Sequence, residues 1–363
     1  MVFQNTYRGF LYRQLFITPA PITPSTVSLA GQTGIVTGSN TGLGYHASSQ
    51  LLSLGLSRLI LAVRDTTKGE KARSSLLATL EESSPGSGKN PPQVEVWPVD
   101  LTNYTSIIEF ANRVRDTPNL HVNFIILNAG VARLGFEPAP NGNEITIQTN
   151  WLSTALMAIT LRPILQAQYT QAKRTATNGH TPPPPVLSMV GSEVAQWAVF
   201  KEREIAASGP HPSVLAVLND REKSNPGDRY NTSKLLLTLF FREFVDRLPS
   251  TKNDVIVNLV NPGFCYGSEL HRAIAGPLGA VFGGMKRAIG RSTEVGARTL
   301  IHGAVVAGKD THGCYLSDEK VAPWMDFVIA PKGEQAAHEM WKELSEELRG
   351  VINIDGVMEQ PGV

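Results

Sequence analysis

Two polar side chains have a type and a spacing suited to acid/base chemistry. Tyr230 and Lys234 are four residues apart in a segment with helical spacing, so both side chains are expected on one face of a helix. A phenol has an ordinary pKa of about 10 and is mostly neutral near neutral pH. A neighbouring ammonium favours the phenolate and brings the group closer to useful acid/base strength. The spacing therefore predicts a working acid/base pair.

A glycine-rich turn suggests the second component of a site. Thr37–Gly44 reads Thr-Gly-Ser-Asn-Thr-Gly-Leu-Gly, and it lies between the apolar segment 34–36 and the helical segment 45–54. Glycine lacks a Cβ, so the turn can adopt tight backbone angles and a ligand can approach the main chain. The N–H groups and the positive end of the following helix favour a phosphate. A glycine-rich loop without a ligand is the alternative.

The elements that must position these groups alternate along the chain. Strands are predicted at 34–36, 58–63, 93–99, 122–127, 186–190, 254–260 and 313–316, and helices at 45–54, 66–82, 106–114, 144–165, 229–245, 292–306 and 334–348. This order predicts an α/β fold with a single Rossmann-type, doubly wound parallel sheet and helices on both faces. Ligands bind such sheets beyond the carboxyl ends of the strands, where Asp100, Asn128 and Ser192 are expected.

No Pro/Gly linker separates two cores, so we expect one domain with decorations. The predicted parts are an N-terminal arm (1–30), a catalytic domain (31–330) with an insertion (193–228) and a substrate lid (266–291), and a C-terminal helix and tail (331–363). The arm contains no acidic residue and carries Arg8 and Arg13. A mitochondrial transit segment is one interpretation, but an arm packed on the domain, or lightly on a membrane, is favoured.

Composition excludes several classes of protein. The 363 residues are 42% hydrophobic, which supports a large core, and the net charge of +1 predicts no nucleic-acid partner. Two cysteines make no disulfide framework, so a reducing, cytoplasmic compartment is expected. The apolar stretch 273–285 is too short for a transmembrane segment, and no metal site is expected.

Several motifs occur together in one order over roughly residues 30–320. They are Thr37–Gly44, Asp100, Asn128-Ala129-Gly130, Asn150, Ser192, Tyr230-x-x-x-Lys234 and Asn261-Pro262-Gly263. This ordered set resembles the short-chain dehydrogenase/reductase superfamily. The wider pattern is similar to retinol-dehydrogenase-like members and most similar to fungal enzymes that tailor secondary metabolites.

The resemblance implies catalytic roles. Tyr230 would donate a proton to a carbonyl oxygen, or remove one from an alcohol, and Lys234 would also hold the nicotinamide ribose. Ser192 would hydrogen-bond the substrate oxygen, and Asn150 would position a water that links Lys234 to solvent. Ser192 precedes Tyr230 by 38 positions, more than is usual in the family. Ser188 is the alternative, but Ser192 is preferred because it follows the strand.

The resemblance also implies a dinucleotide site that extends from the glycine turn to the nicotinamide. Asp100 would accept from the adenine amino group, Asn128 would brace the strand ends, and Ser268 would hold the carboxamide, although one extra residue precedes it. The other implied contacts are with Gly38, Asn40, Leu43, Gly44, Leu101, Gly130, Pro262 and Gly263.

The end of the second strand predicts the choice of cofactor. NAD-preferring relatives place an acid there to bind the ribose 2′-hydroxyl, whereas here Val63 is followed by Arg64. A guanidinium matches a 2′-phosphate, so NADP is expected. Asp65 is interpreted as the N-cap of the next helix. Lys68 either adds charge to the phosphate site or is a solvated lysine.

The segments 193–228 and 266–291 are interpreted as walls over a bulky, apolar small-molecule substrate. The leading hypothesis is an NADP-dependent ketone reductase or alcohol dehydrogenase. The alternatives are a non-redox cyclase or isomerase that uses the same pocket, and a non-catalytic cofactor-binding partner. Homo-oligomer formation is left open, since family members commonly pair through the helices equivalent to 144–165 and 229–245.

Overall fold

A computed structural model of the chain describes residues 3–83, 91–176, 181–209, 213–223, 225–248, 254–267 and 287–359. Ser268 and most of the predicted lid, 268–286, lie outside the described residues, as do residues 360–363 of the predicted tail.

The core of the described chain is an eight-stranded sheet in the order β10-β9-β6-β5-β4-β1-β2-β3. Its strands are β1 (Thr33–Thr37), β2 (Arg58–Val63), β3 (Gln93–Pro98), β4 (Phe124–Leu127), β5 (Val186–Val190), β6 (Ile256–Asn261), β9 (Tyr315–Ser317) and β10 (Lys320–Val321). All pair in parallel except β10, which runs antiparallel to β9 at the edge. The central strands are mostly apolar and are buried along their whole length, as expected when both faces are covered.

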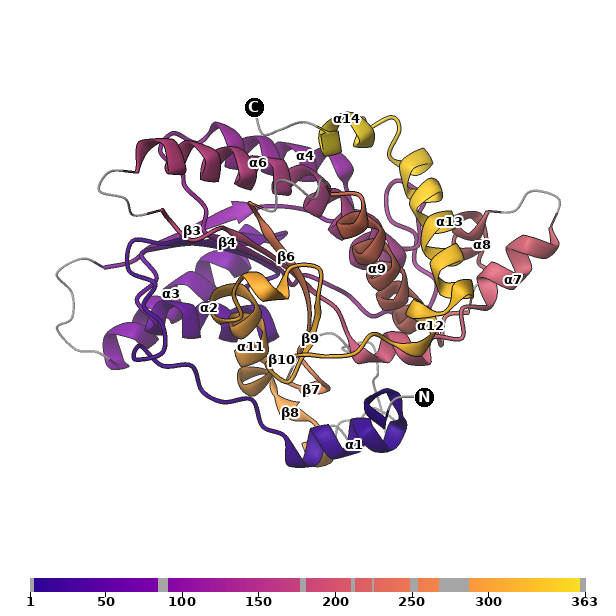
Figure 1. Cartoon of the computed structure of the whole chain (residues 1–363), viewed down its shortest axis with the longest axis horizontal. Coiled ribbons are helices and arrows are strands. Elements are labelled where there is room, and N and C mark those ends of the chain that lie inside the picture. Colours follow the sequence, from indigo (N-terminus) through magenta and orange to yellow (C-terminus); the bar gives the residue numbers. More distant parts are fainter. Residues whose placement is uncertain are drawn as a thin grey trace.

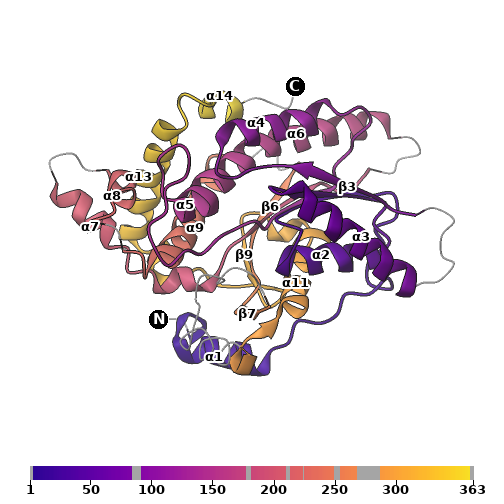
Figure 2. The ribbon, with the colours of Figure 1, turned by 180° about the vertical axis from the view of Figure 1, so that it is seen from behind.

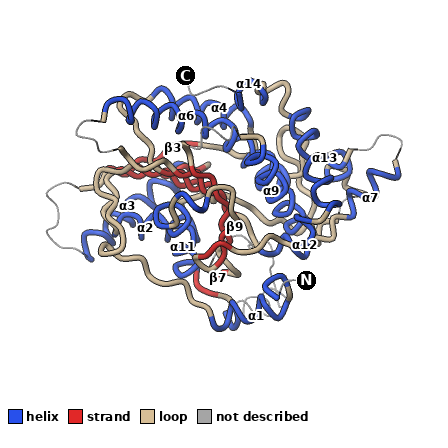
Figure 3. Tube along the Cα trace, in the orientation of Figure 1, coloured by secondary structure: helices blue, strands red, loops and turns tan. Residues whose placement is uncertain are grey.

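Helices cover both faces of this sheet (Figure 1). One layer contains α2 (Gly42–Ser53), α3 (Thr66–Ser83) and α11 (Thr293–Ile301), and the other contains α4 (Tyr104–Asp116), α6 (Ser153–Thr175) and α9 (Arg229–Asp246). Figure 3 shows the strands between the two helical layers. Each layer buries its own hydrophobic cluster against the sheet. The predicted doubly wound fold is confirmed.

The predicted helix 144–165 is interrupted near its start. A single turn, α5 (Ile145–Ile147), leads into a π-helical turn at Gln148–Leu152, and α6 then continues to Thr175. Single π-turns inside helices are frequent at functional sites. Here the wide turn contains Asn150, whose side chain is hydrogen-bonded outside the helix.

The insertion 193–228 is built largely into the core. It contains a 3₁₀ turn (Glu193–Trp197), α7 (Lys201–Ser208) and α8 (Val214–Leu218), and its apolar residues join the main hydrophobic cluster. The C-terminal helix α13 (Pro331–Glu347) holds it, because the Glu343 carboxylate accepts from the first N–H groups of α8. Among the described residues of the insertion, those that line the cavity described below are Glu193, Val194 and Trp197, in its first part. The interpretation of the whole segment as a substrate wall stays a prediction.

The N-terminal arm contains a helix, α1 (Tyr7–Phe16), that begins at the capping residue Thr6. The arm lies beside β7 (Cys265–Tyr266) and β8 (Arg291–Ser292), as Figures 1 and 2 show from opposite sides. Three short helical segments, η1 (Phe3–Asn5), α12 (Asp326–Ile329) and α14 (Ile354–Glu359), complete the two ends. Within the described residues, no helix is long and apolar enough to cross a membrane.

Candidate active site

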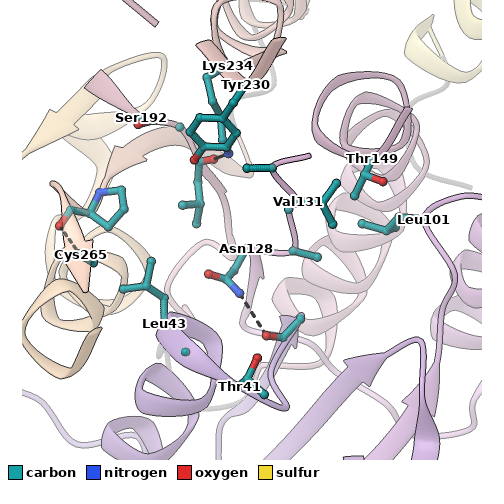
Figure 4. Close-up of a pocket in the computed structure, with 18 of the residues that line it drawn as sticks. Thr41, Leu43, Leu101, Asn128, Val131, Thr149, Ser192, Tyr230, Lys234 and Cys265 are labelled. Carbon is teal, nitrogen blue, oxygen red and sulfur yellow. Dashed lines mark hydrogen bonds between the residues drawn. The ribbon is translucent and has the colours of Figure 1, made fainter. Parts of the chain in front are cut away.

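A cavity of about 500 Å³ lies at the carboxyl ends of the parallel strands. Its walls include the turn after β1 and the residues that follow β2, β3, β4, β5 and β6. Figure 4 shows Ser192, Tyr230 and Lys234 gathered at one end of the cavity, with Asn128 and Thr41 towards the other. The fold thus brings to one cavity side chains that are far apart in the sequence.

The glycine turn has a backbone that other residues would not easily adopt. Gly38 and Gly42 have φ angles of +63° and +58°. A Cβ on Gly44 would collide with the Gly38 carbonyl and approach Asn128 Nδ2 to 2.6 Å. The turn opens directly into α2, whose N-cap residue Thr41 makes no side-chain capping bond. This cradle fits a dinucleotide phosphate, because the start of a helix attracts anions and Gly42 and Leu43, the first residues of α2, line the cavity.

Asn128 joins the ends of β1 and β4. Its Nδ2 donates to the carbonyls of Thr37 at 2.8 Å and Gly38 at 3.3 Å, and its own N–H donates to Thr37 Oγ1 at 2.9 Å. The amide therefore fixes the glycine turn against the next strand, as the expected bracing role requires. The hydroxyl of Thr37 also accepts from Ala129 N–H at 3.0 Å, a contact that the sequence analysis had not identified.

At the end of β2, a buried residue is followed by exposed charged residues. Val63 is 2% exposed at the strand end, whereas Arg64 is exposed and lines the cavity. Asp65 Oδ1 accepts from Lys68 N–H at 3.1 Å, which is the capping contact expected for α3. Lys68 Nζ lies 3.9 Å from the Asp65 carboxylate. Within the described residues, Arg64 has no hydrogen bond or ion pair, so its guanidinium is available to an anion.

Asp100 and Leu101 line the cavity at the end of β3. One Asp100 oxygen accepts from Thr102 N–H at 2.9 Å and from Thr102 Oγ1 at 2.8 Å. The carboxylate is therefore held by its own turn at the position where the adenine contact is expected.

Tyr230, Lys234 and Ser192 form the polar end of the cavity. The side chain of Ser192 hydrogen-bonds Tyr230, and its Oγ accepts from Val194 N–H at 3.4 Å as the cap of the following turn. Ser188 lies inside β5, is fully buried and is not among the residues that line the cavity. The structure therefore brings Ser192, rather than Ser188, to Tyr230.

Burial governs the protonation of the Tyr–Lys pair. Burial raises the pKa of the Tyr230 phenol, and the hydrogen bond from Ser192 only partly opposes this shift. Burial lowers the pKa of Lys234 from 10.5 to about 8. Lys234 Nζ donates to the Val190 carbonyl at 2.8 Å and lies 5.9 Å from the centroid of the Tyr230 ring. Desolvation is the largest influence on the phenol pKa, and Lys234 is not among the groups that lower it, so the expected lowering by the ammonium is absent.

Asn150 is not among the residues that line the cavity. Its Oδ1 accepts from Val131 N–H, and its Nδ2 donates to the Val131 carbonyl and to Ser233 Oγ. A Cβ on the neighbouring Gly130 would lie 3.1 Å from Asn150 Oδ1 and 3.9 Å from Lys234 Nζ. Asn150 thus lies just behind the cavity wall near Lys234, with its side-chain amide bonded to Val131 and Ser233. The expected role in positioning a water stays a prediction.

The loop after β6 closes the cavity on the side of Ser192. Gly263 has a φ of +76°, and Asn261 Oδ1 accepts from the N–H groups of Gly263 at 3.1 Å and Glu193 at 3.2 Å. Pro262 and Gly263 line the cavity, as expected of residues that border a nicotinamide.

Three aromatic residues of the cavity wall escaped the sequence analysis. Phe10 belongs to the N-terminal arm, Trp197 to the insertion and Phe264 to the loop after β6. The sequence signals were that Trp197 lies in the segment interpreted as a substrate wall and that Phe264 directly follows the Asn261-Pro262-Gly263 motif, whereas nothing in the sequence links Phe10 to the site. The described residues contain no cluster of side chains suited to bind a metal.

Comparison with known proteins places these features in context. No family model matches the chain. The short-chain dehydrogenase fogG of Aspergillus ruber is 38% identical over 93% of this chain and 90% of its own length. The short chain dehydrogenase virL of Hypocrea virens is 35% identical over 96% of this chain and 94% of its own length.

Solved structures share the fold at lower identity. A protein of Mycobacterium paratuberculosis superposes with a TM-score of 0.59 at 21% identity, over 91% of this chain and 98% of that chain. The 3-ketoacyl-(acyl-carrier-protein) reductase of Brucella melitensis, solved with NADH, gives a TM-score of 0.51 at 16% identity, over 80% of this chain and 97% of that chain.

Proposed function

Because this chain belongs to the short-chain dehydrogenase/reductase superfamily and is an oxidoreductase, we propose that it uses NADP to interconvert a carbonyl and an alcohol on a bulky, apolar substrate. The observation that carries the proposal is the placement of Tyr230, Ser192 and Lys234 at one end of a cavity whose other end is the glycine turn. One continuous space can therefore hold a dinucleotide and a second molecule.

The chain's own residues supply the proton chemistry. Burial keeps the Tyr230 phenol protonated, so it starts as a proton donor to a carbonyl oxygen. Ser192 can hydrogen-bond that oxygen because it already contacts the phenol. Bound reduced nicotinamide supplies the hydride for the carbonyl carbon. Lys234 would hold the ribose, while the Val190 carbonyl fixes the position of its Nζ.

NADP is preferred in this proposal because of the end of β2. Arg64 is exposed at the cavity wall with no partner among the described side chains, and Val63 offers no acceptor for a ribose 2′-hydroxyl. A guanidinium can bind a phosphate bidentately, whereas a 2′-hydroxyl gives it no charge to pair with.

The curated relatives, at 31–38% identity, are fungal short-chain dehydrogenases of secondary-metabolite clusters, which supports a role in tailoring such metabolites. Cys265 and Cys314 form no disulfide within the described residues, which fits a reducing, cytoplasmic location.

The proposal is tested by incubating the protein with NADPH and a panel of cyclic and polyketide-like ketones. Reduction requires loss of NADPH absorbance together with a two-hydrogen gain in product mass. Product with unchanged elemental composition and no NADPH consumption would instead favour a non-redox isomerase or cyclase. NADPH binding without product from any ketone would favour a non-catalytic cofactor-binding protein.

A further inference from the structure

An aromatic cluster joins the N-terminal arm to the active site. The Phe10 ring lies 5.1 Å from the Trp197 ring at an interplanar angle of 85°, and 6.2 Å from the Phe264 ring at 69°. All three residues line the cavity that contains Tyr230 and Ser192. Edge-to-face pairs of this kind contribute about 0.5–1.5 kcal/mol beyond the burial of their area. The three rings therefore form a preorganised wall, which we call the aromatic wall.

Buried charges fix the arm that supplies Phe10. Arg13 donates to Glu193 at 2.5 Å and lies 3.4 Å from Asp318, and these three side chains are at most 12% exposed. Arg291 donates to Asp318 at 2.8 Å and extends to the carbonyls of Arg13 and Ile17. A buried charge that loses its partner is strongly destabilising, so this network discriminates against an undocked arm.

The contacts of the arm fall on the segments that position the chemistry. Glu193 directly follows Ser192, and Gln14 Nε2 donates to the Glu193 carboxylate at 3.2 Å. A Cβ on Gly263 would lie only 2.9 Å from Gln14 Nε2, so the arm packs tightly over the loop that follows β6. The arm thus contacts both sides of the polar end of the cavity.

We propose that the N-terminal arm is part of the substrate site, with the aromatic wall of Phe10, Trp197 and Phe264 binding a flat aromatic ring of the substrate. Arg13 is a positioning residue that holds Phe10 in place through Glu193. The inference rests on the proposed carbonyl chemistry for its kinetic test, but its binding test does not. On this proposal, an aromatic ring in the substrate is the feature that distinguishes good substrates from poor ones.

The test compares wild type with Phe10→Ala and Phe10→Leu, using 2-acetylnaphthalene and cyclohexanone as probes. With NADPH as reductant, Phe10→Ala should raise the KM for 2-acetylnaphthalene about tenfold or more and leave that for cyclohexanone within about twofold. Phe10→Leu keeps apolar bulk without a ring and should behave like Phe10→Ala. Equilibrium binding of 2-acetylnaphthalene to each NADP-loaded protein should weaken by the same factor.

Phe16→Ala is the matched control, because Phe16 is on the same helix but is 73% exposed. It should leave both KM values and the binding constant unchanged. Arg13→Gln removes no ring, but it should weaken the binding of 2-acetylnaphthalene more than that of cyclohexanone, because Arg13 acts through the placement of Phe10.

Equal effects of Phe10→Ala on the two probes would overturn the inference, as would wild-type behaviour of Phe10→Leu. If wild type reduces neither ketone, the proposed function fails, and the binding constants still decide whether the aromatic wall recognises a ring. Unchanged binding of 2-acetylnaphthalene to Phe10→Ala would then exclude the aromatic wall as a binding site for a ring.

Discussion

Asn150 and Val131 exchange two hydrogen bonds, one in each direction, and both are 2.8 Å long. The same Asn150 amide donates to Ser233 on α9 at 2.9 Å. The π-helical turn at 148–152 therefore ties the segment after β4 to the helix that carries Tyr230 and Lys234. A single side chain couples three segments around the site.

The first prediction tests this coupling. Asn150→Ala removes three buried hydrogen bonds and should lower the free energy of unfolding by about 2–4 kcal/mol, at about 0.5–1.5 kcal/mol for each bond. Urea denaturation measures the change. Asn141→Ala is the control, since Asn141 is exposed and donates to Gln148 in the same turn. Equal losses in the two variants would contradict a special role for Asn150.

The second prediction concerns the proton donor. Tyr230→Phe keeps the ring and removes only the hydroxyl, so ketone reduction should slow by about 10²–10⁴, the usual range for loss of a general acid. NADPH binding, measured by fluorescence titration, should persist because the cradle is untouched. Turnover close to that of wild type would exclude Tyr230 as the acid.

The third prediction follows from the lowered pKa of Lys234. Its pKa is about 8 in the folded protein and 10.5 when exposed, so below pH 8 the fold must hold a buried ammonium that burial disfavours. Lys234→Met should therefore raise the free energy of unfolding at pH 7 by roughly 1–2 kcal/mol, after allowance for the lost bond to Val190. The activity should be lost.

The pH dependence gives the sign of this effect. Between pH 8 and 10.5 the unfolded chain binds the proton and the folded chain does not, so the stability of wild type rises relative to Lys234→Met. The advantage of the variant should shrink as the pH increases through this range. Urea titrations at pH 7 and pH 9.5 measure it, and a constant difference would show that Lys234 is not desolvated.

The fourth prediction concerns the choice of cofactor. Replacing Val63 by Asp and Arg64 by Ser should repel a 2′-phosphate and provide an acceptor for a ribose 2′-hydroxyl. A charge-assisted hydrogen bond contributes about 1.5–3 kcal/mol, so the preference should move towards NAD by roughly tenfold to more than a hundredfold. Titration of both cofactors into both proteins measures it.

Salt dependence provides an independent check of the Arg64 contact. High salt should weaken NADP binding to wild type more than NADP binding to the double variant, because screening acts on the exposed charge pair. A wild-type preference for NAD would show that Arg64 is only a surface residue.

The sequence by itself determined the sheet and the order of its motifs. Short apolar segments such as 124–127 indicate buried strands when helices alternate with them, and this places Asp100, Asn128 and Ser192 at one edge. The spacing of Tyr230 and Lys234 likewise determines that they share a helix face. Both patterns depend only on residues that are close together in the sequence, so they can be recognised without the structure.

Tertiary structure alone decided which distant groups meet. The ion pair of Arg13 with Glu193 joins residues 180 positions apart, and it belongs to the contacts that dock the arm and place Phe10 at the cavity. The wide turn at Asn150 and the lowered pKa of Lys234 also depend on what surrounds each side chain in the fold. Desolvation and long-range pairing have no periodic signature in sequence, which is why the arm's place in the site required the structure.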